Sequence, residues 1–178
     1  MRMLLAIASA ALLIWLLVRW FNREPAIRRV AAGLVAPAYG RVYRVLRGAS
    51  ESTVSIVLTL LDVHAQYYPI GGIVISHTYD ATGQLALVFD LNKSAQNEKV
   101  VTRLRADSGD EVRVTQIAGL AARRIQWRDR TGQRVAKGAP LGRILLGSRV
   151  DVSFPRRWRV VVREGDYVHG PESTLALL

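Results

Sequence analysis

The sequence lacks cysteine entirely and contains few histidines, lysines and acidic residues. Without cysteine, the 178-residue chain has no disulfides, no thiolate zinc site and no cysteine nucleophile. Its three histidines, His64, His77 and His169, are scattered without metal-ligand spacing, so we expect no metal. There are 14 Asp and Glu against 25 Lys and Arg, which gives a formal net charge of +11. This excess favours anionic partners, either phospholipid or nucleic acid, although biased codon usage would also produce it.

Apolar residues, by contrast, are abundant. They make up 50% of the chain, which is enough to bury a core. A disordered basic tail and a collagen-like chain are therefore excluded. The length suits one ordinary domain.

The longest apolar run opens the chain. Residues 3–18 carry no charge, and Trp20 and Phe21 extend the run past Arg19 to about 20 residues, the length of a membrane-spanning helix. A signal peptide is the rival interpretation, but the small residues lie inside the run and its end is a poor cleavage site. We therefore predict a transmembrane anchor over residues 1–21. More arginines follow the run than precede it, which predicts a single-pass protein of the inner (cytoplasmic) membrane with its soluble domain on the cytoplasmic side.

Two further segments are expected after this anchor. Residues 22–52 are basic and punctuated by Pro and Gly, which predicts a connector whose arginines attract anionic headgroups. Residues 53–178 contain short apolar runs separated by Gly, Pro, Asp and Asn, which predict an all-β sandwich or barrel. The runs are 54–61, 73–76, 85–89, 100–104, 112–117, 141–146, 150–154 and 158–162, and only 119–124 looks helical.

Two segments near the end of the chain have similar sequences. Residues 132–135 (Gly-Gln-Arg-Val) are followed by Gly138, and residues 165–168 (Gly-Asp-Tyr-Val) are followed by Gly170. This pattern is typical of the hairpin repeats of lipoyl-carrier-like barrels, in which two quasi-repeats fold around one core. Neither hairpin tip carries a carrier lysine, so we expect no lipoylated or biotinylated domain.

Five motifs occur in order along the chain. They are residues 21–25 (Phe-Asn-Arg-Glu-Pro), 61–64 (Leu-Asp-Val-His), 97–98 (Asn-Glu), 116–125 (Gln-Ile-Ala-Gly-Leu-Ala-Ala-Arg-Arg-Ile) and 146–151 (Leu-Gly-Ser-Arg-Val-Asp). On these motifs the chain, from residue 21 to its end, resembles the phosphatidylserine decarboxylase family in its short, single-domain form. The resemblance implies a membrane-anchored, pyruvoyl-dependent lyase of phospholipid biosynthesis that is made as a zymogen. Such an enzyme converts phosphatidylserine to phosphatidylethanolamine.

The resemblance also implies the catalytic residues. Self-cleavage between Gly147 and Ser148 would turn Ser148 into the pyruvoyl cofactor, and no metal would be needed. His64 would be the base for this step, because the Ser148 hydroxyl is a weak nucleophile and a neutral imidazole accepts its proton. Asp62 would orient His64 if the fold places its carboxylate beside the imidazole.

Arginines of the same motifs would bind the substrate. Arg123, Arg124 and Arg149 are suited to the phosphate or carboxylate of the lipid, because a guanidinium matches the geometry of such anions. The partners implied are an anionic phospholipid membrane and phosphatidylserine. The basic stretch 156–159 has a single aromatic residue, which is too few for a nucleic-acid surface, so we expect no nucleic acid.

Two positions depart from the family pattern. Residues 37–40 read Pro-Ala-Tyr-Gly where the family has Pro-Ala-Asp-Gly, so Tyr39 replaces the carboxylate that orients the histidine. Tyr67 stands three residues past His64, where the short form has Arg and the long form a second His. A neutral phenol does not stabilise an imidazolium as a carboxylate does. A second hypothesis is therefore a non-catalytic homologue that serves as an accessory or assembly subunit of a membrane protein complex.

Overall fold

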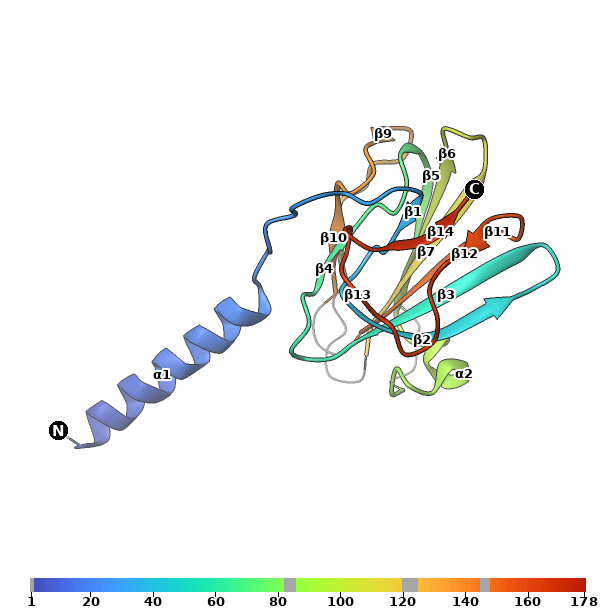
Figure 1. The fold of residues 1–178 in the computed structure, drawn as a ribbon. Helices are drawn as coiled ribbons and strands as arrows, with labels where there is room; N and C mark the ends of the chain where they lie inside the picture. The colour runs from blue at the N-terminus through green and yellow to red at the C-terminus, as the bar shows by residue number, and fades with distance from the viewer. Residues whose placement is uncertain (1, 82–85, 120–124, 145–147) are drawn as a thin grey trace.

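A computed structural model describes residues 2–81, 86–119, 125–144 and 148–178 of the chain. Over these residues the chain forms two helices and fourteen strands (Figure 1). The helices are α1 (Arg2–Phe21) and α2 (Leu91–Ser94). The strands are β1 (Leu34–Val35), β2 (Gly40–Arg47), β3 (Glu51–Leu58), β4 (Ala65–Tyr67), β5 (Gly72–Asp80), β6 (Lys99–Ala106), β7 (Glu111–Ile117), β8 (Ile125–Trp127), β9 (Arg134–Val135), β10 (Pro140–Ile144), β11 (Ser148–Pro155), β12 (Arg159–Val160), β13 (Tyr167–Val168) and β14 (Thr174–Leu177). The body of the chain is therefore built of β-strands, as predicted.

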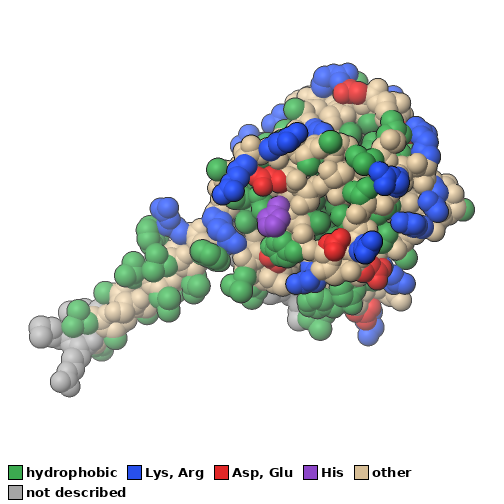
Figure 2. Space-filling model, in the orientation of Figure 1, with side chains coloured by type: hydrophobic (Ala, Val, Ile, Leu, Met, Phe, Trp, Pro, Cys, Tyr) green, Lys and Arg blue, Asp and Glu red, His purple; other side chains and the backbone are tan. Residues whose placement is uncertain are grey.

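Helix α1 projects away from the strands (Figure 1). Its Leu and Ala residues have high helix propensity, and the Asn22 side chain donates a hydrogen bond to the Val18 carbonyl oxygen (2.9 Å) at its end. Large apolar side chains of α1 remain exposed, for example Leu13 at 59% and Leu17 at 58%. In Figure 2, apolar side chains cover the projecting helix, whereas Lys and Arg are spread over the visible face of the β domain.

The structure does not support the membrane span predicted for residues 1–21. Among the residues that it describes, no helix combines the length and the mean hydropathy that crossing a membrane requires.

The largest sheet has eight antiparallel strands in the order β13-β2-β3-β11-β7-β6-β5-β9. Side chains alternate between its two faces. In β6, for example, Val100, Thr102 and Leu104 are buried, while Arg103 and Arg105 are exposed. One face of this sheet therefore supplies apolar side chains to a core.

Strand β11 lies in the interior of this sheet, between β3 and β7. Its register with β3 places Ser148 opposite Leu58, and its register with β7 places Arg149 opposite Ile117. Val150 points into the core and is fully buried. Because both edges of β11 are paired, its backbone hydrogen bonds are satisfied and its first residues are held in place.

Two three-stranded sheets pack against the inner face of the large sheet. Their orders are β4-β10-β8 and β1-β14-β12. One cluster of buried apolar residues joins all three sheets and includes Ile56 of β3, Val114 of β7, Ile144 of β10 and Leu175 of β14. The β4-β10-β8 sheet matters most for the site described below, because β4 begins directly after His64.

The structure differs from the predicted elements at several places, and β4, β8 and β14 lie outside the predicted runs. Residues 86–89, predicted as the end of a strand, form a turn before α2. Strands β1 and β2 lie inside the predicted connector 22–52, and β2 pairs with β3. The sequence did not predict β2, because Arg41, Arg44 and Arg47 interrupt its apolar residues. Most of the predicted helical stretch 119–124 lies outside the described residues.

The two similar segments, 132–135 and 165–168, contribute short strands at opposite ends of the large sheet. The first contributes β9, which pairs with β5, and the second contributes β13, which pairs with β2. Gly138 and Gly165 have φ values of 79° and 94°, in the left-handed region that glycine adopts without strain. The repeated glycines thus serve the turns that flank these two strands.

Gly142 is expected to resist substitution. Strand β10 lies between β4 and β8, and a Cβ atom on Gly142 would overlap the backbone carbonyl oxygen of Gln126 in β8. Gly142→Ala should therefore lower the free energy of unfolding by about 2 kcal/mol. The control is Gly71→Ala, because a Cβ there meets its nearest neighbours at 3.6 Å, an ordinary contact. Urea denaturation of both variants measures the difference, and equal stabilities would show that β8 and β10 separate without cost.

Candidate active site

Ser148 is the first residue of β11 and is fully buried. Its Oγ has no hydrogen-bond partner among the described residues. Burying a hydroxyl without a partner costs free energy, so such groups are rare in folded proteins and call for an explanation. A hydroxyl held for a reaction is one explanation. Gly147, the residue on the other side of the expected cleavage point, lies outside the described residues.

His64 lies in the loop between β3 and β4 and is also fully buried. Its Nδ1 is 2.9 Å from the backbone carbonyl oxygen of Asp62. A carbonyl oxygen only accepts hydrogen bonds, so Nδ1 carries the proton of the neutral imidazole and Nε2 carries the lone pair. Burial lowers the pKa of His64 below its ordinary 6.5, against the opposing effect of Asp62. The imidazole is therefore neutral at pH 7 and suited to accept a proton.

Strand pairing brings His64 close to the segment that leads to Ser148. The backbone N–H of Ile144 donates to the carbonyl oxygen of His64 (3.4 Å), and Ile144 precedes Ser148 by four positions. Next to this contact, β4 and β10 pair Ala65 with Arg143. The structure thus places the imidazole and the hydroxyl at the same end of the β domain.

Two buried glutamines extend this connection to the large sheet. The Nε2 of Gln66 donates to the carbonyl oxygen of His64 (2.6 Å), and the Nε2 of Gln116 donates to the Oε1 of Gln66 (2.8 Å). Gln116 belongs to β7 and lies opposite Val150 of β11. The histidine loop is therefore joined by side-chain hydrogen bonds to the strand that flanks Ser148.

Asp62 contacts the imidazole through its backbone and not through its carboxylate. The carboxylate accepts hydrogen bonds from the backbone N–H (2.7 Å) and the Oγ1 (2.8 Å) of Thr59, and also from the hydroxyl of Tyr167. These three bonds fix the turn 59–62 and, with it, the carbonyl oxygen that faces His64. Tyr167 was not foreseen from the sequence, because it lies 105 positions from Asp62 and no local pattern marks it.

Tyr39 and Tyr67, the two departures from the family pattern, belong to an aromatic group beside this turn. Tyr39 makes edge contacts with Tyr67 (6.4 Å between ring centroids) and with His169 (5.8 Å), and His169 contacts Tyr167 (5.1 Å). Burial raises the pKa of Tyr39 to about 12, helped by the nearby Tyr67. Burial also raises the pKa of Tyr67. Both phenols are therefore neutral at pH 7 and stabilise by packing, not by charge.

Arg149 was expected to bind substrate, but the structure places its guanidinium inside the protein. Only 3% of the residue is exposed. The guanidinium forms an ion pair with Asp151 (3.1 Å) and donates to the Oγ of Ser94 (2.6 Å) and the carbonyl oxygen of Leu91 (3.2 Å). Arg149 therefore ties the start of β11 to α2 and presents no open face to a ligand. Arg123 and Arg124 lie outside the described residues.

The described residues contain no group of three or more His, Cys, Asp or Glu side chains that could hold a metal ion. The chemistry they offer is a buried hydroxyl, a neutral imidazole and a network that orients it. A serine-derived prosthetic group fits this arrangement, because the Ser148 Oγ is buried and has no hydrogen-bond partner in the described parts of the chain.

Comparison of the sequence with known proteins points to one family. A sequence model described as phosphatidylserine decarboxylase matches residues 16–176. The chain is 40% identical to a phosphatidylserine decarboxylase proenzyme of Saccharopolyspora erythraea, over 89% of this chain and 72% of that protein. It is 38% identical to a protein of the same name from Solibacter usitatus (95% and 82%), and 34% identical to a putative archaetidylserine decarboxylase proenzyme of Methanococcoides burtonii (89% and 74%). No solved structure matches.

Arg149→Met is expected to lower the free energy of unfolding by about 3 kcal/mol, because it leaves the Asp151 carboxylate buried without its cation. Arg105→Met, which removes an exposed arginine from the same sheet, is the control and should change stability little. Chemical denaturation at pH 7 measures both variants. A similar loss in the two would mean that the buried pair contributes nothing specific.

The cost of Arg149→Met should also depend on pH. Burial raises the pKa of Asp151 above its ordinary 3.8, and Arg149 opposes that shift, so the variant should have a still higher pKa in the folded state. The folded chain then binds this proton more readily than the unfolded chain, and stability falls as pH rises from 3.8 through the folded pKa. The stability deficit of the variant should therefore shrink as pH is lowered from 7 toward that range.

Proposed function

This chain belongs to the phosphatidylserine decarboxylase family, and from that premise we propose that it is a self-processing lyase. Its substrate would be phosphatidylserine, and its products carbon dioxide and phosphatidylethanolamine. The observation that carries the proposal is the buried Oγ of Ser148, which has no partner among the residues that the structure describes and lies at the same end of the fold as a neutral His64. The relatives' printed name, proenzyme, supports processing before activity.

Processing would begin with the Ser148 hydroxyl. His64 takes the hydroxyl proton on Nε2 while Oγ attacks the carbonyl carbon of Gly147, and the peptide bond is replaced by an ester. Loss of the α-proton of residue 148 then expels the carboxylate of Gly147 and leaves a dehydroalanine, which tautomerises to an imine. Water adds to this imine and ammonia leaves, so that the fragment 148–178 begins with a pyruvoyl group. When formed, that group supplies a carbonyl that withdraws the electron pair released as carbon dioxide leaves.

His64 is supported in this role by its surroundings. The Asp62 carbonyl oxygen holds the Nδ1 proton, which leaves the Nε2 lone pair as the basic site. In the family pattern a carboxylate would stabilise the imidazolium formed during the attack, and Tyr39 takes its place here. The turn held by the Asp62 carboxylate and Tyr167 supplies a fixed dipole instead of a charge. We therefore propose that Asp62 and Tyr167 position His64, and that Gly147 is the cleavage residue.

The enzyme proposal is preferred to a non-catalytic accessory subunit. The accessory hypothesis rests on Tyr39 and Tyr67, and both are accommodated by burial and ring packing beside an intact His64 loop. The named relatives are all decarboxylase proenzymes. Nothing in their names points to an assembly subunit.

We place the reaction at the surface of an anionic membrane. The substrate is a lipid, the chain carries a net charge of +11, and α1 presents exposed apolar side chains away from the β domain (Figures 1 and 2). Of the arginines expected to bind the headgroup, Arg123 and Arg124 keep that proposed role. For Arg149 we propose a structural role, because its guanidinium is already paired.

Denaturing electrophoresis and intact-mass measurement of the purified chain test the processing step. The wild type should separate into residues 1–147 and 148–178, with the mass of a pyruvoyl group on the smaller fragment, and should release carbon dioxide from phosphatidylserine. Ser148→Ala should stay in one piece and be inactive. Ser153→Ala, in the same strand but hydrogen-bonded to Thr53, should still be cleaved. An intact, inactive wild type would refute the proposal.

Tyr167→Phe should slow self-cleavage by about tenfold, since it removes one charge-assisted hydrogen bond from the Asp62 carboxylate and keeps the ring. Tyr43→Phe is the control, because Tyr43 is exposed and contacts only Phe89 among the aromatic rings described.

The cleavage rate of the wild type should rise with pH and level off, with a midpoint below 6.5, because His64 must be neutral to act as the base and its pKa is lowered. A merely structural Tyr167 would leave the rate and its pH profile unchanged.

A further inference from the structure

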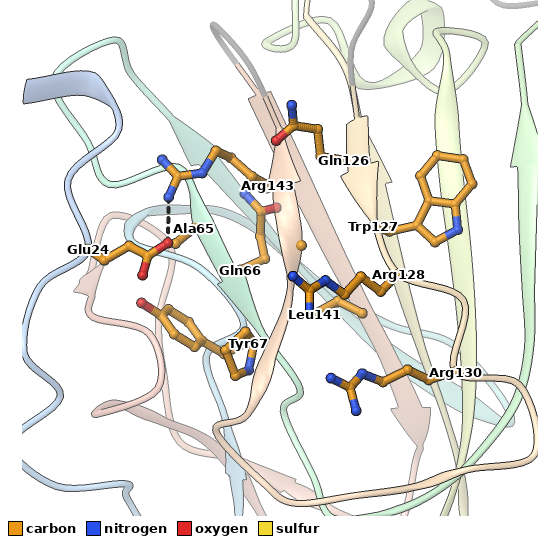
Figure 3. A pocket seen from close by; sticks show the side chains of 12 residues that line it. Glu24, Ala65, Gln66, Tyr67, Gln126, Trp127, Arg128, Arg130, Leu141 and Arg143 are labelled. Atoms are coloured by element: carbon orange, nitrogen blue, oxygen red, sulfur yellow. Dashed lines mark hydrogen bonds and ion pairs between the residues drawn. The ribbon is translucent and has the colours of Figure 1, made fainter. Parts of the chain in front are cut away.

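A cavity lies beside the β4-β10-β8 sheet, apart from the residues used in the reaction proposed above. Its volume is about 450 Å³, and its walls include Tyr67 of β4, Trp127 of β8, Arg143 of β10 and, just after β8, Arg128 and Arg130 (Figure 3). Arg128 and Arg130 extend from one side of the cavity in Figure 3, and Tyr67 lies on the other. We refer to this cavity as the arginine pocket.

The arginine pocket is separate from the two residues that the proposed reaction uses. Its lining includes the neighbouring residues Ala65, Gln66 and Tyr67, but neither His64 nor Ser148. Both His64 and Ser148 are fully buried. A ligand in the pocket would therefore not contact the Ser148 hydroxyl.

The charge of the pocket is unbalanced. Three arginines line it, and Glu24 is the sole acidic residue among its described lining residues. Arg143 is bound by the Glu24 carboxylate (2.9 Å) and the Asn22 Oδ1 (3.2 Å). Guanidinium groups gathered in one cavity repel each other, and this repulsion is relieved by an anion with several acceptor oxygens. Phosphate has that geometry, because its oxygens accept paired N–H bonds from a guanidinium.

Glu24 marks where such an anion would bind. Its side chain is 76% exposed, whereas that of Arg143 is only 13% exposed, so an exposed carboxylate from the connector lies on a largely buried guanidinium. In Figure 3 Arg143 points toward Glu24, and a dashed line marks their ion pair. The exposed carboxylate returns to water when it leaves Arg143. A bound phosphate would therefore replace Glu24 as the partner of Arg143.

We propose that the arginine pocket binds the phosphate group of an anionic compound, with Arg128, Arg130 and Arg143 as its donors. The phosphate comes either from a membrane phospholipid or from a small soluble phosphate compound. The position of the pocket favours the lipid, because Asn22 and Glu24 immediately follow α1, whose apolar side chains are exposed. Acyl chains would then lie along α1 while the phosphate occupies the pocket.

Binding of the full-length chain to phosphatidylcholine vesicles containing phosphatidylglycerol tests the lipid source, and titration with inorganic phosphate tests the soluble source. Phosphatidylglycerol has no amine and is not a substrate for decarboxylation, so the result is independent of the proposed function. Arg128→Gln/Arg130→Gln is compared with Arg156→Gln/Arg159→Gln, which removes the same charge where the chain passes from β11 to β12. Self-cleavage is followed in parallel and should be equal in all variants.

The pocket variant should bind phosphatidylglycerol vesicles about tenfold more weakly than the charge-matched control. Glu24→Gln should bind them about threefold more tightly than the wild type, because it frees Arg143. If the same differences appear with inorganic phosphate and not with vesicles, the ligand is a soluble phosphate compound. Equal losses in the two double variants, with no effect of Glu24→Gln on either probe, would reduce the pocket to part of a general positive charge and overturn the proposal.

Discussion

The two-sided pairing of β11 is the constraint on which the candidate site depends. β3 and β7 hold β11 in the interior of the eight-stranded sheet, and the register with β3 begins at Ser148 itself. Without this pairing the hydroxyl would have no defined position relative to the His64 loop. The buried pair Arg149–Asp151, directly after Ser148, adds a second fixed point. In the attack proposed for Ser148, such rigidity is an advantage, because the reacting atoms are held near their reactive arrangement.

The fold was predictable from the sequence where apolar residues alternate regularly with polar ones. The segments 100–104, 112–117 and 150–154 lie within β6, β7 and β11, because their alternating buried residues have the period of a strand. Strand β2 was not predicted, because three arginines at its exposed positions interrupt the apolar pattern. Residues 86–89 are apolar but form a turn, and Leu87 and Phe89 remain exposed. Hydrophobicity alone does not reveal which apolar residues the core leaves outside.

The site was predictable only as far as short motifs reach. Leu-Asp-Val-His and Gly-Ser-Arg-Val-Asp located His64 and Ser148, and pairing of β4 with β10 brings these motifs to one end of the fold. The contacts of their side chains were not predictable. Tyr167 contacts Asp62 from the strand β13, far away in the sequence, and Arg149 turns inward to Asp151. Both contacts arise from tertiary packing, which a linear pattern does not encode.

Residues 148–178 supply β11 to the interior of the large sheet and β12, β13 and β14 around it. A chain cut before Ser148 would therefore consist of two interlaced peptides, neither with a complete core. Complete unfolding would let them diffuse apart, and refolding would become a bimolecular reaction whose rate depends on concentration. The cut would thus turn a reversibly folding chain into a protein that persists mainly through slow unfolding. In such a molecule folding has to come first, since the hydroxyl and the imidazole reach the same end of the fold only after β11 has been inserted between its neighbours.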